Sequence, residues 1–191
     1  MRDAINQVDT ALFLWLNSLY ASWLDPVMIF ATERNTWFPF YALLIGWLVF
    51  RYRKQALWMV LTLAAAVAIS DQTASALLKP LTLRLRPCHV PALQKLIHPV
   101  MDCGGPYGFA SSHAANTFAL ATGLWLLVGQ QHPWAKWVFL WAVFVSYSRI
   151  YVAAHYPLDV LAGAGIGVLA ATLCVTTLRS LQARSANRKA V

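Results

Sequence analysis

The sequence predicts one all-α domain, 1–191, built as a polytopic membrane helical bundle of about six transmembrane helices. Its 191 residues are 59% hydrophobic and only 12% charged, whereas a soluble domain carries about 25% charged residues. The mean hydropathy is +0.54, and nine tryptophans suit membrane interfaces. Apolar segments follow one another at roughly 11–33, 36–50, 56–78, 109–128, 134–150 and 157–178.

The first segment is the least regular. A spanning helix needs about 20 apolar residues, and Asn17, Asp25 and Pro26 interrupt residues 11–33. This segment therefore either spans or forms an amphipathic or broken helix. The bundle then has six spans, or five spans and an interfacial helix.

The third segment contains a carboxylate, Asp71. Charged groups inside a membrane are costly and often functional. Asp71 precedes Lys79 by eight residues, about 12 Å along a helix. We therefore expect a structural hydrogen bond within the bundle rather than a place in a site near Lys79.

The outer loop, 79–112, begins with three cations: Lys79, Arg84 and Arg86. Such a cluster at one helix end forms a strong anion site. The alternative is a lipid-facing cluster whose long side chains reach the membrane surface.

Two cysteines, Cys88 and Cys103, lie within this loop. On an oxidising outer side they could form a disulfide, closing a loop of about 16 residues and contributing roughly 3 kcal/mol. The alternative is a zinc site with His89 and His98, although the spacing matches no standard zinc motif.

The fourth segment follows Ser111, Ser112 and His113. Either serine is a good N-cap, and the N–H groups of a first helical turn attract an anion. The alternative is a capped helix with an incidental histidine. Asn116, one turn further, could bind substrate or cross-link helices.

The last two segments are joined by "SRIYVAAHYPLD", 148–159, which holds Arg149, His155 and Asp159. Pro157 suits the first position of a helix and disfavours helical geometry in the residue before it. We therefore expect His155 just outside the last helix and Asp159 in its first turn. Asp159 either fixes the imidazole tautomer or only complements the helix dipole.

The last segment also carries "LAGAGIG", in which Gly163 and Gly167 form a small-xxx-small pair. Such pairs permit close packing of membrane helices. No strand precedes these glycines, which excludes a nucleotide-binding loop.

Basic residues set the expected topology. Arg51, Arg53, Lys54, Lys136 and the polar, frayed tail 179–191 fall on one side with the N-terminus, and that side is expected to be cytoplasmic. The net charge of +8 does not indicate a nucleic-acid partner, because the cations lie at the ends of apolar runs. Basic residues usually lie on the cytoplasmic side of a membrane protein. The cations expected on the outer side depart from this tendency, and an anionic ligand would explain them.

Taken together, three motifs resemble the signature of the type 2 phosphatidic-acid phosphatase superfamily of integral-membrane lipid phosphate phosphatases. Lys79 with Arg86-Pro87 matches the first motif and Ser148-Arg149, His155 and Asp159 match the third. The second motif, Pro-Ser-Gly-His, reads "ASSH" here, with Ala110 for Pro and Ser112 for Gly. Both replacements are small and keep the Ser and His, so we expect the chemistry to survive.

The resemblance implies a role for each residue. His155 would attack phosphorus and form a phosphohistidine, Asp159 would orient it, and His113 would protonate the leaving oxygen. The phosphate oxygens would be held by Lys79, Arg86, Ser111, Ser112 and Arg149. It implies no metal and no cofactor. Arg84 lies outside the motif, and only contact with a diphosphate or head group is expected of it.

The expected protein is a multi-pass phosphatase of a bacterial inner membrane with its site facing the periplasm. Its expected partners are the bilayer and a lipid phosphate: undecaprenyl diphosphate, phosphatidylglycerol phosphate, phosphatidic acid or lipid A phosphate. One alternative is a lipid phosphotransferase that passes the phosphoryl group to another lipid. Another is a non-catalytic lipid-phosphate-binding membrane protein, which would not need both His113 and His155.

Overall fold

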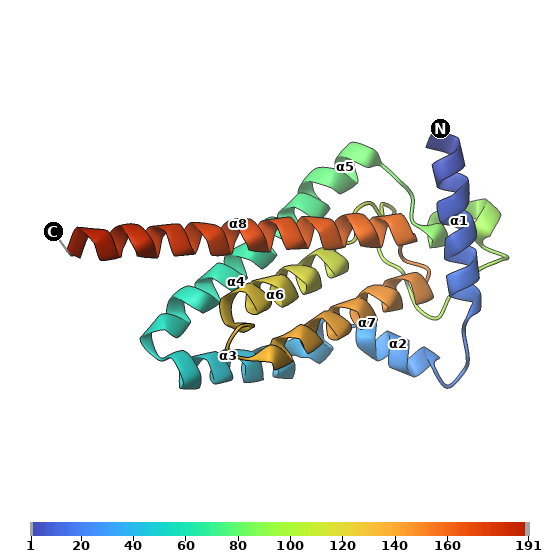
Figure 1. The fold of residues 1–191 in the computed structure, drawn as a ribbon. Helices are drawn as coiled ribbons and strands as arrows, with labels where there is room; N and C mark the ends of the chain where they lie inside the picture. Colours follow the sequence, from blue (N-terminus) through green and yellow to red (C-terminus); the bar gives the residue numbers. More distant parts are fainter. Residues whose placement is uncertain (1, 190–191) are drawn as a thin grey trace.

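The computed structural model describes residues 2–189, which form a bundle of helices without a β-strand (Figure 1). The predicted all-helical bundle is thus confirmed. The helices are α1 (Arg2–Ser18), α2 (Asp25–Thr32), α3 (Phe38–Tyr52), α4 (Lys54–Gln72), α5 (Lys79–Thr82), α6 (Ser112–Val128), α7 (Trp137–Tyr151) and α8 (Pro157–Lys189).

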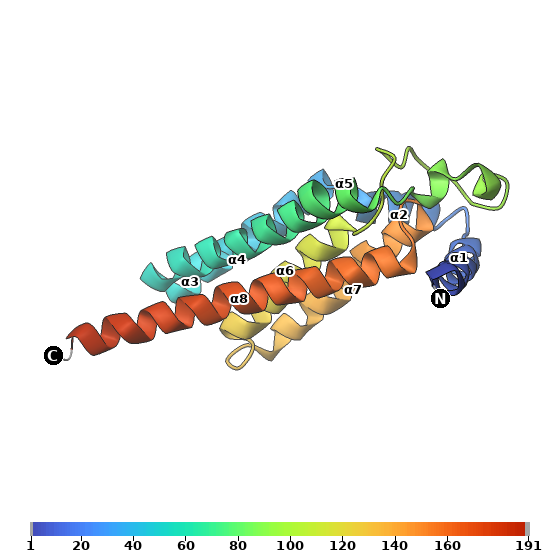
Figure 2. The ribbon, with the colours of Figure 1, turned by 90° about the horizontal axis from the view of Figure 1, so that it is seen from above.

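Two long helices are apolar enough to cross a membrane. One is Lys54–Thr82, in which a π-helical stretch, Thr73–Leu78, joins α4 to α5, and the other is Pro157–Asn187. Helices α3, α6 and α7 run lengthwise beside them (Figure 2). The expectation that the tail is frayed is wrong for residues 179–189, because α8 continues to Lys189. No Gly or Pro interrupts these residues, and Leu, Gln, Arg and Ala all favour helix.

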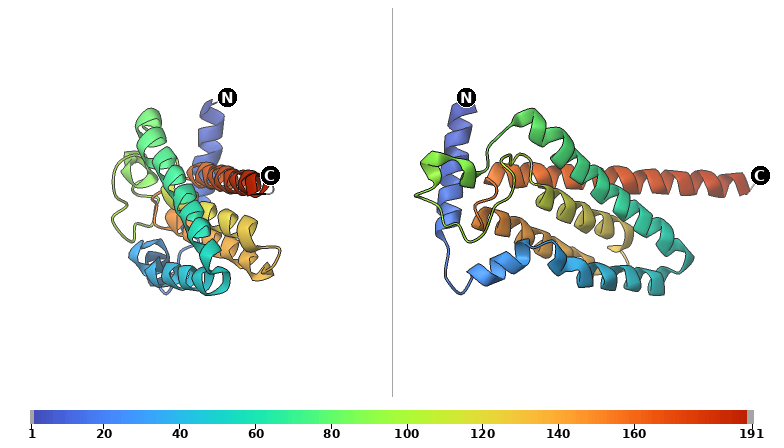
Figure 3. Two further views of the ribbon diagram at one scale, coloured as in Figure 1. Left: turned by 90° about the vertical axis from the view of Figure 1, so that its left-hand side faces the viewer. Right: turned by 180° about the vertical axis from the view of Figure 1, so that it is seen from behind.

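The first apolar segment is broken, which was one of the two alternatives. Helix α1 ends at Ser18, and α2 begins at Asp25 with Pro26 in its first turn. Figures 1 and 3 show α1 crossing the end of the bundle at a large angle to α8.

The expected position of the N-terminus, at the end opposite to the outer loop, is wrong. Asp9 of α1 forms an ion pair of 2.6 Å with Arg84 of that loop. Asn17 donates a 2.7 Å hydrogen bond to the carbonyl of Tyr151, where α7 ends. These polar partners hold α1 at the same end of the bundle as the outer loop.

Helices α6 and α8 pack in very close contact, as predicted from the glycine pair. A Cβ on Gly163 would lie 2.3 Å from the carbonyl oxygen of Ser111, and one on Gly167 would lie 2.2 Å from that of Ala115. At the end of this contact, the Ser111 N–H donates a 2.9 Å hydrogen bond to the Asp159 carbonyl. The glycines therefore set the distance between two of the three motifs.

The glycine contact gives a prediction about stability. Gly167→Ala should lower the unfolding temperature in detergent, because its methyl group collides with the α6 backbone, and overpacking costs about 1–3 kcal/mol. Gly165→Ala is the matched control, since a Cβ there meets nothing within 4 Å. Equal unfolding temperatures for the two variants would contradict this account of the packing.

Candidate active site

The motif residues gather at the end of the bundle that carries the outer loop. Lys79 begins α5, Ser112 and His113 begin α6, Arg149 lies in the last turn of α7, and Asp159 in the first turn of α8. Arg86, Arg149, His155 and Asp159 are all buried. The chain thus brings the three motifs together, although they are separated by up to 80 residues in sequence.

His155 lies where the sequence predicted, between α7 and α8, because α8 begins at Pro157. One Asp159 oxygen, Oδ2, accepts a 3.0 Å hydrogen bond from the Tyr156 N–H and lies 3.6 Å from Nδ1 of His155. This separation exceeds an ordinary N–H···O distance of about 2.7–3.2 Å, but such contacts often tighten when substrate binds. Asp159 therefore faces Nδ1, which leaves Nε2 of the ring for chemistry.

The environment of His155 disfavours its protonated form. Burial lowers the pKa of His155 well below its ordinary value of 6.5, and the positive charges of Arg149, Arg86 and Lys79 lower it further. The imidazole is therefore neutral near pH 7, with a lone pair available to attack an electrophile.

The Arg149 guanidinium has a hydrogen-bond partner at Nη1 but none at Nε within the described residues. Its Nη1 donates to the hydroxyl of Thr32, at the end of α2. Its Nε is buried and has no hydrogen-bond partner among residues 2–189. A buried donor without a partner is costly, so this nitrogen is suited to an anionic oxygen in the site.

Arg86 is positioned by the loop that follows it. Its Nε donates to the carbonyl of Tyr107 at 3.1 Å, and its Nη1 donates to the carbonyl of Cys103. These two acceptors fix the guanidinium, while its positive charge acts on the buried His155.

The start of α6 supplies neutral donors. Ser111 is the N-cap, and its hydroxyl accepts a 3.4 Å hydrogen bond from the Ala114 N–H. The N–H groups of the first turn, at Ser112 and His113, have no acceptor within a helix. Lys79 Nζ lies 3.4 Å from the Ser112 hydroxyl, which brings an ammonium group to the first turn of α6.

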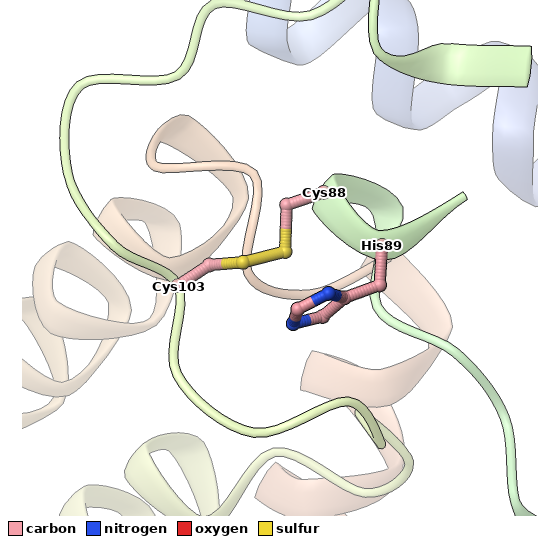
Figure 4. A group of neighbouring side chains, drawn as sticks. All are labelled: Cys88, His89 and Cys103. Carbon is pink, nitrogen blue, oxygen red and sulfur yellow. A yellow bond between two sulfur atoms is a disulfide. The ribbon is translucent and has the colours of Figure 1, made fainter. Parts of the chain in front are cut away.

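A disulfide joins Cys88 to Cys103 across the outer loop. His89 lies beside it (Figure 4), and its Nε2 is 2.8 Å from the Gly104 carbonyl oxygen. These three side chains are close enough to surround a metal ion, but the bonded sulfurs are not the thiolates that zinc requires. His98, the fourth residue of the zinc alternative, instead lies 3.0 Å from Asp25.

Gly108 packs directly against the His155–Asp159 pair. A Cβ at this position would lie 3.1 Å from Asp159 Oδ2, 3.2 Å from Arg86 Cγ and 3.6 Å from His155 Nδ1. A larger residue would displace at least one of the three side chains.

Asn116 and Asp71 cross-link two helices near the site. Asn116 donates a 2.8 Å hydrogen bond from Nδ2 to Asp71 and accepts one of 3.1 Å from the Ser70 hydroxyl. The expected structural role of Asp71 is confirmed, and Asn116 is a cross-link between α4 and α6.

A cavity of about 590 Å³ extends from the site between α3, α4 and α6. Its polar part is lined by Glu33, Arg34, Asp71, Ser112, His113 and Asn116. Its apolar part is lined by residues such as Tyr41, Leu44, Leu48, Val60, Leu63, Ala64 and Ala68. An apolar space that reaches Ser112 and His113 at the start of α6 suits the tail of a lipid whose head group lies at the motif residues.

Arg84 does not extend freely toward a head group, which corrects the expectation for this residue. It forms ion pairs of 2.6 Å with both Asp9 and Asp159. Sequence reasoning missed Asp9, Thr32 and Gly108. Thr32 is a polar residue within an apolar segment, but that signal does not identify a partner. Asp9 precedes the first apolar segment, so its sequence context carried no such signal.

The profile of the PAP2 superfamily matches residues 55–182. A lipid A 4'-phosphatase of Bacteroides thetaiotaomicron is 35% identical in an alignment of 188 residues, which covers 96% of this chain and 83% of that protein. A lipid A 4'-phosphatase of Porphyromonas gingivalis is 30% identical over 170 residues, covering 87% and 71%. The crystal structure of Aquifex aeolicus LpxE superposes with a TM-score of 0.69 at 26% identity, covering 87% of this chain and 94% of that one.

The contact at Gly108 predicts a loss of activity. Gly108→Val should lower kcat/KM for phosphate release from a lipid phosphate by roughly 10- to 100-fold, because a misplacement of about 1 Å in a catalytic group has this effect. Gly105→Val is the matched control, because a Cβ on Gly105 meets nothing within 4 Å. Wild-type kcat/KM in Gly108→Val would show that the loop does not position the pair.

Proposed function

The chain belongs to the PAP2 superfamily, and from this we propose that it hydrolyses a phosphate monoester of lipid A through a phosphohistidine at His155. Its relatives make it a membrane lipid phosphatase, a phosphoric monoester hydrolase. The proposed location is a bacterial inner membrane, with the site facing the periplasm, where the positive-inside rule places the end opposite to Arg51, Arg53 and Lys54.

The observation that carries the phosphohistidine proposal is the environment of His155. This imidazole is buried and neutral, and an acid faces one of its nitrogens. Arg149 with its unpartnered Nε contributes a positive charge beside it. A neutral nucleophile next to a cationic phosphate site is what in-line attack on phosphorus requires.

In the proposed first step, Nε2 of His155 attacks phosphorus and forms an N–P bond as the bond from phosphorus to the lipid oxygen breaks. His113, which the negative charge of the bound phosphate keeps protonated, gives its proton to the departing lipid oxygen. Asp159 stabilises the positive charge that develops on the imidazole, through Nδ1–H. In the second step, His113 accepts a proton from water, whose oxygen attacks phosphorus and releases phosphate and neutral His155.

The charge of the phosphoryl group is balanced by protein groups in this mechanism. Lys79, Arg86 and Arg149 supply three positive charges, and the first turn of α6 supplies N–H donors. Donors that are already oriented toward a developing charge are commonly the largest contribution to catalysis. We therefore propose that hydrolysis does not require an added divalent metal.

The choice of lipid A among the expected lipid phosphates rests on the two lipid A 4'-phosphatases that resemble this chain. We propose that an acyl chain of the substrate occupies the apolar cavity between α3, α4 and α6, with the phosphate near His113. A tail in this cavity would hold the head group at the motif residues.

The intermediate can be tested by trapping. With radiolabelled lipid phosphate and a chelator present, rapid acid-free quenching should leave label on the wild-type protein. His155→Ala should carry no label, and its kcat should fall by at least about 10³-fold. His132→Ala is the control, because His132 lies in the α6–α7 connection at the other end of the bundle. Free phosphate, not a phosphorylated acceptor lipid, is the expected product. Full turnover by His155→Ala would refute the mechanism.

The cavity predicts selectivity for acyl-chain length. Ala68→Trp should fill the cavity and lower kcat/KM for a long-chain lipid phosphate by roughly 10-fold, which equals about 1.4 kcal/mol, with little effect on a short-chain analogue. Ala65→Trp is the matched control, because Ala65 is exposed on the same helix and does not line the cavity. The same loss for both chain lengths would mean that the cavity does not hold the tail.

A further inference from the structure

Arg84 is bound on two sides by carboxylates. Its Nη1 donates to Oδ1 of Asp159 and its Nη2 donates to Oδ2 of Asp9, each at 2.6 Å. The guanidinium also stacks over the ring of Tyr156, 4.2 Å from its centroid. Although burial alone would lower the pKa of Arg84, the two carboxylates raise it, so the residue stays charged between them.

Asp9 is fixed as firmly as Arg84. Its side chain is 1% exposed, and its second oxygen, Oδ1, accepts a 2.9 Å hydrogen bond from the Leu158 N–H in the first turn of α8. Loss of either partner would leave a buried charge without compensation, which is strongly destabilising. Asp9 thus contacts both the guanidinium that holds Asp159 and the helix turn that carries Asp159.

This arrangement controls the acid that orients His155. Arg84 holds Oδ1 of Asp159, while Oδ2 accepts from the Tyr156 N–H and faces Nδ1 of His155. Without Asp9, the full charge of Arg84 would act on Asp159 alone. Asp159 would then be a poorer partner for a developing imidazolium.

Helix α1, which carries Asp9, has two distinct faces. Asp9, Phe13 and Asn17 are buried at intervals of four residues, and the Phe13 ring packs edge-on against Tyr156 with 5.3 Å between centroids. A second face exposes an apolar stripe at intervals of three or four residues: Ile5, Val8, Leu12 and Trp15. The exposed Leu19 continues this spacing directly after the helix. This spacing is that of one helical face.

The stripe lies at the end of the bundle, on a helix that crosses the lengthwise direction of α8 (Figures 1 and 3). An amphipathic helix in this orientation lies in the plane of a membrane surface with its apolar face among the lipids. Trp15 belongs to the stripe, and Trp favours this depth. The partner that fits the stripe is therefore the lipid surface that also contains the substrate.

We propose that Asp9 and Arg84 are positioning residues. They connect α1, which lies on the membrane surface, to the His155–Asp159 pair, so that contact of α1 with lipid sets the catalytic rate. This inference rests on the proposed function, in which His155 and Asp159 act on the lipid phosphate. The enzyme is then fully active only where α1 lies on a bilayer.

The first test replaces Asp9 in the full-length protein, reconstituted in lipid nanodiscs with a lipid phosphate. Asp9→Asn should lower kcat roughly 10- to 100-fold, with KM within about twofold of the wild type because no substrate contact is lost. Removal of a negative charge should also shift the acid limb of kcat/KM to lower pH. Asp3→Asn is the matched control, since Asp3 is exposed on the same helix.

The outcomes separate this proposal from the proposed function. An inactive wild-type protein would refute the function, whereas an active wild type with Asp9→Asn equal to Asp3→Asn in kcat and pH profile would refute the link alone. If Asp9→Asn does not fold, Arg84→Lys takes its place, because Lys lacks the fork that reaches two carboxylates. A wild-type kcat in Arg84→Lys would equally overturn the proposal.

The contribution of lipid contact is tested on the stripe itself. The double variant Val8→Gln, Leu12→Gln should lose kcat severalfold in nanodiscs and shift its pH profile in the direction of Asp9→Asn. Leu181→Gln, which removes an exposed leucine near the far end of α8, should keep wild-type kcat. Equal kcat in the double variant and in Leu181→Gln would show that seating of α1 does not set the rate.

Discussion

The hydrogen bond from the Ser111 N–H to the Asp159 carbonyl joins the two helix starts that form the site. It exists only because α8 approaches the backbone of α6 at Gly163 and Gly167, where no side chain could fit. This contact fixes the donors of the α6 first turn relative to His155 and its acid. The outer loop then adds Arg86 and Gly108 against the same pair. Packing of α8 against the first turns of α6 thereby determines the geometry of the site.

The electrostatics of the site follow from this packing. Three cationic side chains and a helix N-terminus surround a buried imidazole. Burial keeps this imidazole neutral, and the neighbouring positive charges disfavour its protonation further. The carboxylates do not neutralise this surplus completely, since Asp159 is shared with Arg84 and Asp9 is committed to Arg84 and α8. A phosphate dianion would complete the charge balance. The same surplus of positive charge attracts the substrate and disfavours protonation of the nucleophile.

Much of this arrangement was predictable from local sequence. Pro157 determined where α8 begins, and so placed His155 outside the helix and Asp159 within its first turn. Spacing alone also identified the glycine pair. The contacts of Arg84 were not predictable, because Asp9 and Asp159 are each 75 residues away and no local pattern selects between partners at that separation. The end at which α1 lies was missed for the same reason, since it depends on the partners of Asp9 and Asn17 rather than on hydropathy.

In the proposed mechanism, Nε2 of His155 attacks phosphorus among these cationic groups. Vanadate imitates the five-coordinate phosphorus of the transition state, and a structure determined with vanadate would show which atom is the nucleophile. We expect vanadium bonded to Nε2 of His155, with its oxygens facing Nε of Arg149 and the N–H groups of Ser112 and His113. Vanadate bonded to another side chain, or held through a metal ion away from His155, would contradict this mechanism.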